Sequence, residues 1–296
     1  MSCDDQELTA LTGSRQTVYQ TARLAYPLSL AALVVAVVTS WIFLALMGLR
    51  TASVAPRSAG PGAAWLQHFP DVALPAPFEA FLALCLTPIG AGNDLTAFVL
   101  LTFMWFLMAL AMMLPSAAPL LRTYCEIADT AARKGESVVH PIVLVAGYLT
   151  VWLAASFGFA GMALGISMIL PGDTVLSPWT GLGGATVLAI AGAYQFSGLK
   201  EACLIKCRNP FATLFDHWSA RRASIYRLGI RQGAWCLGCC WALMLVMFAV
   251  GLMNVFWMAL LGVFTMVEKS GHSRAVTRIS GALLLVWALT LLVISF

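Results

Sequence analysis

The residues best suited to chemistry in this sequence are cysteines, which recur at helical spacing in two short segments. Cys203 and Cys207 are four positions apart, so on a helix they share one face. Cys236 precedes Cys239 and Cys240 by three and four positions, which places all three on one side of a helix. Deprotonated thiols bind soft metal ions such as Cu(I), and also Zn²⁺. Thiolates from two neighbouring helices would form a low-coordinate or tetrahedral site.

The remaining three of the eight cysteines, Cys3, Cys85 and Cys125, are isolated in the sequence. A lone cysteine usually behaves as a small buried hydrophobic residue, and we interpret Cys3 and Cys85 in that way. Cys125 is expected at the same depth as the two clusters. Packing is also the alternative to metal binding for the clusters themselves.

Methionines indicate the same metal chemistry. Met104, Met108 and Met112 recur at every fourth position, with Met113 next to the last of them. A thioether is a neutral soft ligand that suits Cu(I) better than Zn²⁺ or Mg²⁺. We therefore include Met112 and Met113 among the candidate ligands and expect Met253 or Met258 nearer an outer entrance. Met is also a common gap-filler in helix packing, which is the alternative for this stripe.

Other site signatures are weak. The four histidines show neither HExxH nor HxxxH spacing, and His217 is the one expected beside the cysteine segments. The sequence contains no GxxxxGK[ST], GxSxG or GxGxxG motif. An enzymatic reading would thus rest on a metal or on redox chemistry of the CxxCC group.

The elements that must position these residues are long apolar segments. The chain is 60% hydrophobic and 10% charged, whereas soluble domains are about 25% charged. An α-helix crosses a bilayer with roughly 20 apolar residues. Such segments are residues 25–49, 95–121, 138–170, 180–204 and 276–296, and 229–267 is long enough for two spans joined near Gly251. This predicts an all-α, polytopic transmembrane helical bundle of about seven helices, with a kink or early helix end at Pro115.

The basic residues orient this arrangement. Of the 17 Lys and Arg residues, all except Arg50 and Arg57 fall on one side of the membrane if there are seven spans. The positive-inside rule then predicts a cytoplasmic N-terminus and an external C-terminus. We expect a cytoplasmic segment at 1–24 and a single transmembrane domain at 25–296. Within that domain we expect an external Pro-rich loop at 50–94 and a basic cytoplasmic loop at 207–231.

The spans contain two charged residues near an end and a pair of glycines at regular spacing. Lys200 and Glu201 are close enough to the membrane interface that we expect their side chains to reach the polar layer. Gly161 and Gly165 have the spacing typical of close helix approach.

Three strings of the sequence carry a resemblance. They are AMMLPSAAP at 111–119, YQFSGLKEACLIKCRNP at 194–210 and CLGCCWALMLVMFAVGLMNVFWMA at 236–259, followed by Glu268 and Lys269. From about residue 95 to residue 269 the chain resembles a bacterial family of predicted metal-binding integral membrane proteins of unknown function. The resemblance implies a metal-binding membrane protein and no particular activity.

These observations lead to one expectation for function and three alternatives. We expect a membrane protein that binds a soft ion, foremost Cu(I), between the spans at 95–121, 180–204 and the first half of 229–267, for transport or for delivery to a partner. Zinc is the alternative metal if four cysteines enclose it. The alternative functions are a structural subunit of a larger membrane complex and a membrane metalloenzyme or thiol oxidoreductase. The expected partners are the lipid bilayer and a protein or second copy. Nucleic acid is not expected, because the net charge is only +4 and basic runs lack interleaved aromatics.

Overall fold

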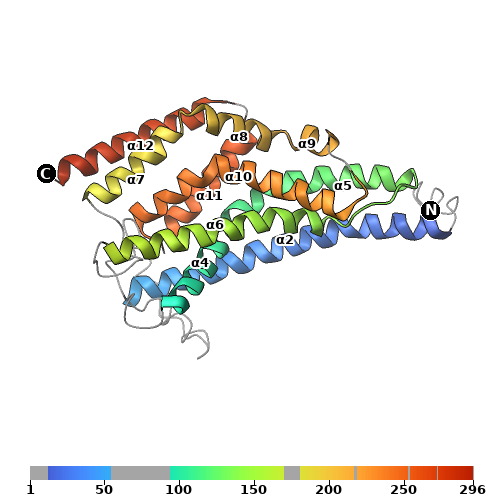
Figure 1. Ribbon diagram of the computed structural model, residues 1–296, viewed down its shortest axis with the longest axis horizontal. Coiled ribbons are helices and arrows are strands. Elements are labelled where there is room, and N and C mark those ends of the chain that lie inside the picture. Colours follow the sequence, from blue (N-terminus) through green and yellow to red (C-terminus); the bar gives the residue numbers. More distant parts are fainter. Residues whose placement is uncertain are drawn as a thin grey trace.

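The computed structural model describes residues 13–54, 94–169, 181–216, 219–252, 254–271 and 273–295, and within them it contains helices and no strand. Figure 1 shows the long helices lying side by side along the longest axis, with the two ends of the chain at opposite ends of the molecule. The helices are α2 (Gly13–Val54), α4 (Asp94–Met113), the 3₁₀ turn η3 (Pro115–Ala117), α5 (Ala118–Arg133), α6 (Ile142–Ile169), α7 (Gly181–Tyr194), α8 (Gly198–Arg208), α9 (Pro210–Asp216), α10 (Arg222–Val250), α11 (Val255–Ser270) and α12 (Ala275–Ile294).

Several of these helices are long and apolar enough to cross a membrane. Five described helices meet that condition alone, namely α2, α4, α6, α10 and α12, and the bent pair α7 and α8 would make a sixth span. This indicates a polytopic helical membrane protein, as the composition predicts. The remaining predicted span, the second half of 229–267, corresponds to α11, whose 16 residues are fewer than those of the five long helices. The count of seven and the orientation of the termini stay predictions.

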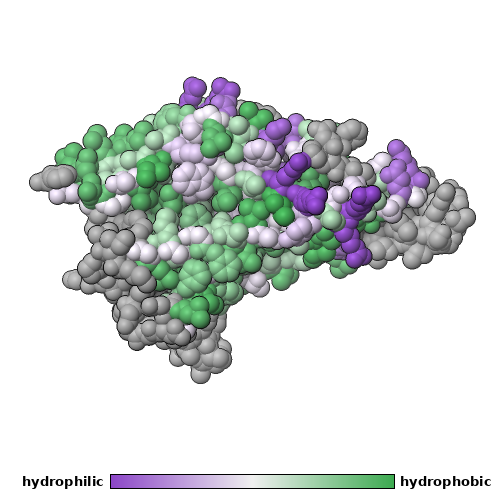
Figure 2. Space-filling model, in the orientation of Figure 1, coloured by the Kyte–Doolittle hydropathy of each residue, from purple (hydrophilic) through white to green (hydrophobic). Residues whose placement is uncertain are grey.

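Helix α10 is the central helix of the bundle. In its most apolar stretch 67% of the residues are buried, against 22% in α2 and in α12. It packs against α6, α7 and α8, while α12 packs mainly against α7. Figure 2 shows how polar and apolar residues are distributed on the surface. Apolar residues cover the end that holds α7 and α12, and hydrophilic residues gather toward α5, α9 and the start of α10.

Two helix ends follow from single residues in the sequence. The segment predicted at 95–121 ends as α4 at Met113, because Pro115 lacks the amide hydrogen that would continue the helix. The segment 229–267 divides at Gly251, which has a positive φ of 100° that other residues rarely adopt. Both breaks are confirmed.

The segment predicted as one span at 180–204 is bent in the structure. It breaks after Tyr194 and restarts at Gly198, with a bend of 63° between α7 and α8. Ser197 caps the new helix by accepting a hydrogen bond from the main-chain nitrogen of Lys200. The predicted span is therefore a bent pair of helices, because the chain leaves the helical conformation at Ser197, which caps the helix that begins at Gly198.

Other predictions concern segments that are partly undescribed. Most of the expected loop at 50–94 and the first half of the N-terminal segment at 1–24 lie outside the described residues, as do His217 and Met253. The stretch 207–231 is largely helical, because it contains the end of α8, all of α9 and the start of α10.

Candidate metal centre

Sulfur atoms from two helices meet where α8 packs against α10. The Sγ atom of Cys207 on α8 lies 3.9 Å from the Sγ atom of Cys239 on α10. Cys239 Sγ is in turn 3.3 Å from Cys240 Sγ and donates to the main-chain oxygen of Cys236 at 3.1 Å. Cys236, Cys239 and Cys240 are buried, and Cys207 is half-buried. We call Cys207, Cys236, Cys239 and Cys240 the thiol cluster.

Cys203 lies one turn before Cys207 and occupies a different place. A Cβ atom on Gly238 would stand 2.6 Å from the Sγ atom of Cys203, so the glycine makes room for this sulfur against the backbone of α10. Tyr194, the last residue of α7, donates a hydrogen bond to the main-chain oxygen of the same glycine. These contacts hold the end of α7 and the middle of α8 against α10.

Cys236 has two hydrogen-bond partners that sequence reasoning did not assign. The Nζ atom of Lys269 on α11 lies 3.0 Å from its Sγ atom, and the Tyr148 hydroxyl on α6 lies 3.0 Å away as well. Lys269 also donates to Ser116 Oγ at 2.8 Å. Because an ammonium group stabilises the negative charge of a thiolate, this sulfur lies where an ionised form is favoured.

Tyr148 reaches Cys236 because α6 and α10 cross in close contact. A Cβ atom on Gly229 of α10 would overlap the main-chain oxygen of Leu144, and one on Gly147 of α6 would overlap that of Tyr226. Small residues allow this approach in membrane helices. The predicted glycine pair is not the one used: a Cβ on Gly161 meets only ordinary contact, and one on Gly165 meets no described atom within 4 Å.

A buried ion pair fixes the end of α11 beside the thiol cluster. Lys200 Nζ lies 2.9 Å from Glu268 Oε2, and their side chains are 1% and 0% exposed. Thr277 donates to the other carboxylate oxygen at 2.7 Å. The prediction that Lys200 reaches the polar layer was therefore wrong. Glu201 is partly exposed and pairs with Arg274.

The methionines of α4 lie in the hydrophobic core of the bundle. Met104, Met108, Met112 and Met113 are all buried. Met113 joins the cluster through its main-chain oxygen, which accepts a hydrogen bond from Tyr148 at 3.1 Å. Met112 packs toward α11, where its Cγ atom is 3.6 Å from the Cβ position of Gly262. Their thioether atoms as ligands stay a prediction.

Cys125 lies apart from the thiol cluster, on α5. Burial, followed by the charges of the neighbouring carboxylates Glu126 and Asp129, raises the pKa of its thiol to about 12. A thiol of this kind stays protonated at neutral pH and is a poor metal ligand.

The geometry of the thiol cluster suits a soft ion shared by two helices. With metal–sulfur bonds of about 2.3 Å, two ligand sulfurs lie ~3.8 Å apart at a tetrahedral angle and ~4.6 Å apart in a linear arrangement. The distance of 3.9 Å between Cys207 and Cys239 falls in this range, whereas 3.3 Å between Cys239 and Cys240 is short for two ligands of one ion. No three Cys, His, Asp or Glu side chains among the described residues are grouped as a ready metal site. The pair across the two helices is therefore the element of the cluster best placed to hold an ion.

Sequence reasoning identified the right helices but not all of the residues that meet. It expected Cys203 or Cys207 to share an ion with Cys236 or Cys240, while the closest pair across the helices is Cys207 with Cys239. Tyr148, Lys269 and Ser116 were not predicted to take part. Ser116 and Lys269 do lie in the segments that carry the resemblance, so a signal for them was present.

Fold and site together define a polytopic helical membrane protein with a thiol cluster at the junction of two helices. The family model described as PpoB2, copper chaperone, matches residues 102–291. Because this match covers more than half of the chain, the protein belongs to the PpoB2 copper chaperone family. The resemblance to a metal-binding family is thus supported in part, because the family that matches is related to copper. Comparisons with curated proteins and with solved structures found no match.

Proposed function

We propose that this protein holds Cu(I) as cargo between Cys207 and Cys239 and delivers it to an acceptor protein. The observation that carries the proposal is the distance of 3.9 Å between these two sulfurs, which come from different helices. Membership in a copper chaperone family supports copper as the metal. Cys240 and Cys203 stand beside the pair, and Met112 and Met113 belong to the surrounding soft environment.

Two sulfur ligands favour Cu(I) because this ion accepts low coordination numbers and soft donors. Zn²⁺ in protein sites almost always takes four ligands in a tetrahedron. Zinc would require Cys203, Cys207, Cys239 and Cys240 to close together, and Cys203 points its sulfur at Gly238 instead.

The charge around the cluster fits this cargo. Cu(I) bound by two thiolates carries a net charge of −1, and a buried charge needs a partner. The ammonium group of Lys269, hydrogen-bonded to Cys236, supplies the opposite charge. Cys236 then acts as the sulfur that exchanges with the bound ion during release. As it binds the ion, its proton passes to the cysteine that leaves, so the net charge of −1 beside Lys269 is unchanged.

The proposal extends to the membrane. The chain crosses a bacterial inner membrane seven times with its N-terminus inside, so that the thiol cluster lies toward the cytoplasmic ends of the helices, where thiols stay reduced. Cysteine reporters at Ser53 and Ser273, labelled from either side of intact cells in a background without the other exposed thiols, should react from opposite sides. Labelling of both from the same side would contradict the odd number of crossings.

The test of the copper site compares the two paired cysteines with a cysteine outside the thiol cluster. Full-length protein is purified under reducing conditions, and copper and zinc are measured after Cu(I) loading in competition with a Cu(I) chelator. We expect Cys207→Ser and Cys239→Ser each to weaken Cu(I) binding by at least tenfold, because serine replaces a soft ligand with a hard one. Cys125→Ser is the matched control and should bind as the wild type does.

Cys203→Ser separates this proposal from a zinc site. It should leave most Cu(I) affinity in place, since its sulfur is not part of the closest pair. If Cys203→Ser abolished binding together with Cys207→Ser, a four-cysteine site would replace the two-cysteine one. If copper binding were unchanged in both Cys207→Ser and Cys239→Ser, the cysteines would only pack, as in a structural subunit.

A further inference from the structure

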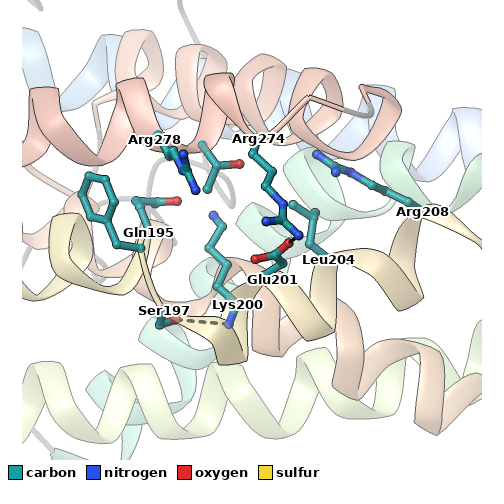
Figure 3. Close-up of a pocket in the computed structure, with 10 residues that line it drawn as sticks. Gln195, Ser197, Lys200, Glu201, Leu204, Arg208, Arg274 and Arg278 are labelled. Carbon is teal, nitrogen blue, oxygen red and sulfur yellow. Dashed lines mark hydrogen bonds and ion pairs between the residues drawn. The ribbon is translucent and has the colours of Figure 1, made fainter.

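A second polar site lies on the other side of the Lys200–Glu268 ion pair from the thiol cluster. It is a pocket of about 350 Å³ at the break between α7 and α8, closed on one side by the start of α12. At about 30 Å³ per water molecule it has room for roughly ten waters. Figure 3 shows Gln195, Lys200 and Arg278 pointing toward one another across it.

The pocket has an excess of positive charge. Lys200 is neutralised by Glu268, and Arg274 is paired with Glu201. The guanidinium group of Arg208 donates to the main-chain oxygen of Glu268, with Nη2 at 2.7 Å. Its positive charge is therefore not paired with a carboxylate among the described residues.

Arg278 is the second uncompensated charge. It lines the pocket from α12, and no described carboxylate pairs with it. Two of the arginines that line the pocket therefore have no carboxylate partner among the described residues. Guanidinium groups bind phosphate and carboxylate through paired, charge-assisted hydrogen bonds.

Gln195 supplies an independent indication of a ligand. Its side chain is 4% exposed, and neither Nε2 nor Oε1 has a hydrogen-bond partner within the described structure. Leaving buried polar atoms unpaired costs about 1–3 kcal/mol each, and native proteins rarely do so. Gly281 of α12 holds the residue in place, because a Cβ there would stand 2.7 Å from Gln195 Cβ. A ligand with both an acceptor oxygen and a hydroxyl or ammonium donor would satisfy the amide.

We propose that this pocket binds a phosphate group, with Arg278 and Arg208 balancing its charge and Gln195 hydrogen-bonded to it. The group belongs either to an anionic phospholipid or to free phosphate, since both present the same oxygens. The pocket adjoins Arg274, immediately before the apolar helix α12, and basic pockets at such helix ends are placed to bind lipid headgroups. This site is separate from copper binding and does not depend on it.

The experiment uses full-length protein in nanodiscs and measures the thermal unfolding midpoint together with the apparent Kd. In one arm the discs contain phosphatidylcholine alone, and potassium phosphate is titrated against potassium chloride at equal ionic strength. In the other arm the discs contain phosphatidylcholine with or without phosphatidylglycerol. Stabilisation in both arms assigns the site to any phosphate group, and stabilisation by phosphatidylglycerol alone assigns it to a lipid.

Two variants and one control test the residues. We expect Arg278→Gln to weaken the phosphate-dependent stabilisation at least tenfold in apparent Kd, the size of one charged hydrogen bond. Gln195→Leu should have a higher unfolding midpoint than the wild type without ligand, because the unpaired amide is gone, and should lose most of the gain on adding phosphate or phosphatidylglycerol. Arg227→Gln removes an equal charge from an exposed position on α10 and should respond as the wild type does.

The proposal is overturned by either of two results. One is an absence of stabilisation in both arms. The other is an equal response of wild type, Arg278→Gln, Gln195→Leu and Arg227→Gln, which would mean that the anion acts on the surface charge as a whole. Copper loading, measured in the same samples, should be the same in Arg278→Gln as in the wild type, so failure here leaves the copper proposal standing.

Discussion

Two neighbouring residues at the end of α11 solve the problem of a buried charge in different ways. Glu268 pairs with the ammonium group of Lys200 on α8 at 2.9 Å. Lys269 donates instead to the sulfur of Cys236 on α10 at 3.0 Å. The first partner is a permanent ion, whereas the second is a thiol that can carry a proton, a negative charge or a metal.

The difference separates a structural contact from a chemical one. Both oxygens of the Glu268 carboxylate have a hydrogen-bond partner, because Thr277 donates to the second one, and the side chain is 0% exposed. The Lys269–Cys236 contact is linked through Cys239 to the rest of the thiol cluster, and through Tyr148 to the main chain of Met113. In a polar pair that holds helices together, every hydrogen-bonding atom must have a partner. A pair that takes part in ion exchange must keep one member that can carry either a proton or a metal.

The largest expected effect is on the structural pair. We expect Lys200→Met or Glu268→Gln to lower the free energy of unfolding by about 3–5 kcal/mol, because each leaves a buried charge or an unmatched polar group. The measurement is unfolding of the purified protein in mixed detergent. The double variant Lys200→Met with Glu268→Leu should recover most of the loss, since apolar residues of similar volume replace the whole pair. A double variant no more stable than the single ones would contradict the assignment.

The next effect is on the chemical pair. Lys269→Met should weaken Cu(I) binding by about tenfold to a hundredfold, because the copper–thiolate complex loses its counter-charge. Its loss of affinity on acidification should begin at a higher pH than in the wild type, since protons then compete more effectively for the thiols. Lys269→Arg keeps the charge and should retain more affinity than Lys269→Met. Equal affinity of wild type and Lys269→Met across pH would show that Lys269 only packs.

How far the sequence predicts this arrangement depends on the distance between the interacting residues. The apolar segments, the break at Pro115 and the turn at Gly251 follow from local composition, because a bilayer and a proline act on a few consecutive residues. The spacing of Cys203 with Cys207 is local in the same sense and is confirmed as part of one helix, α8.

Contacts between helices were harder to predict. The approach of α6 to α10 uses Gly147 and Gly229, which lie far apart in the sequence, rather than the regular pair Gly161 and Gly165. The same holds for Lys269, which reaches Cys236 only after the chain has turned at Gly251. One sequence contains no information on which helix faces meet, because lipid and protein neighbours are equally apolar.

A smaller effect concerns the glycine that seats Cys203. We expect Gly238→Ala to lower the free energy of unfolding by about 1–3 kcal/mol, because the new methyl group would meet the sulfur atom and force α8 away from α10. Adding Cys203→Ala should relieve the clash and restore part of the loss, which a double-mutant cycle in mixed detergent would measure. Gly165→Ala is the matched control, since a Cβ there meets no described atom within 4 Å. Equal losses for Gly238→Ala and Gly165→Ala would mean that the contact with Cys203 has no effect.

The smallest effect is expected at the cysteine outside the thiol cluster. Burial, followed by the carboxylates of Glu126 and Asp129, raises the pKa of Cys125 to about 12, so about one thiol in ten thousand is ionised at pH 8. Because the thiolate is the reactive form, alkylation of Cys125 should be slow at pH 7 and should speed up about tenfold per pH unit up to pH 10 without reaching a plateau. Mass spectrometry of peptides after timed iodoacetamide treatment measures this directly, with denatured protein as the reference. Alkylation that levels off near pH 9, as for an ordinary thiol, would show that the carboxylates and burial do not act on Cys125. Copper bound by Cys207 and Cys239 should protect those two residues and leave the rate at Cys125 unchanged, which separates the thiols that carry the ion from the one that only packs.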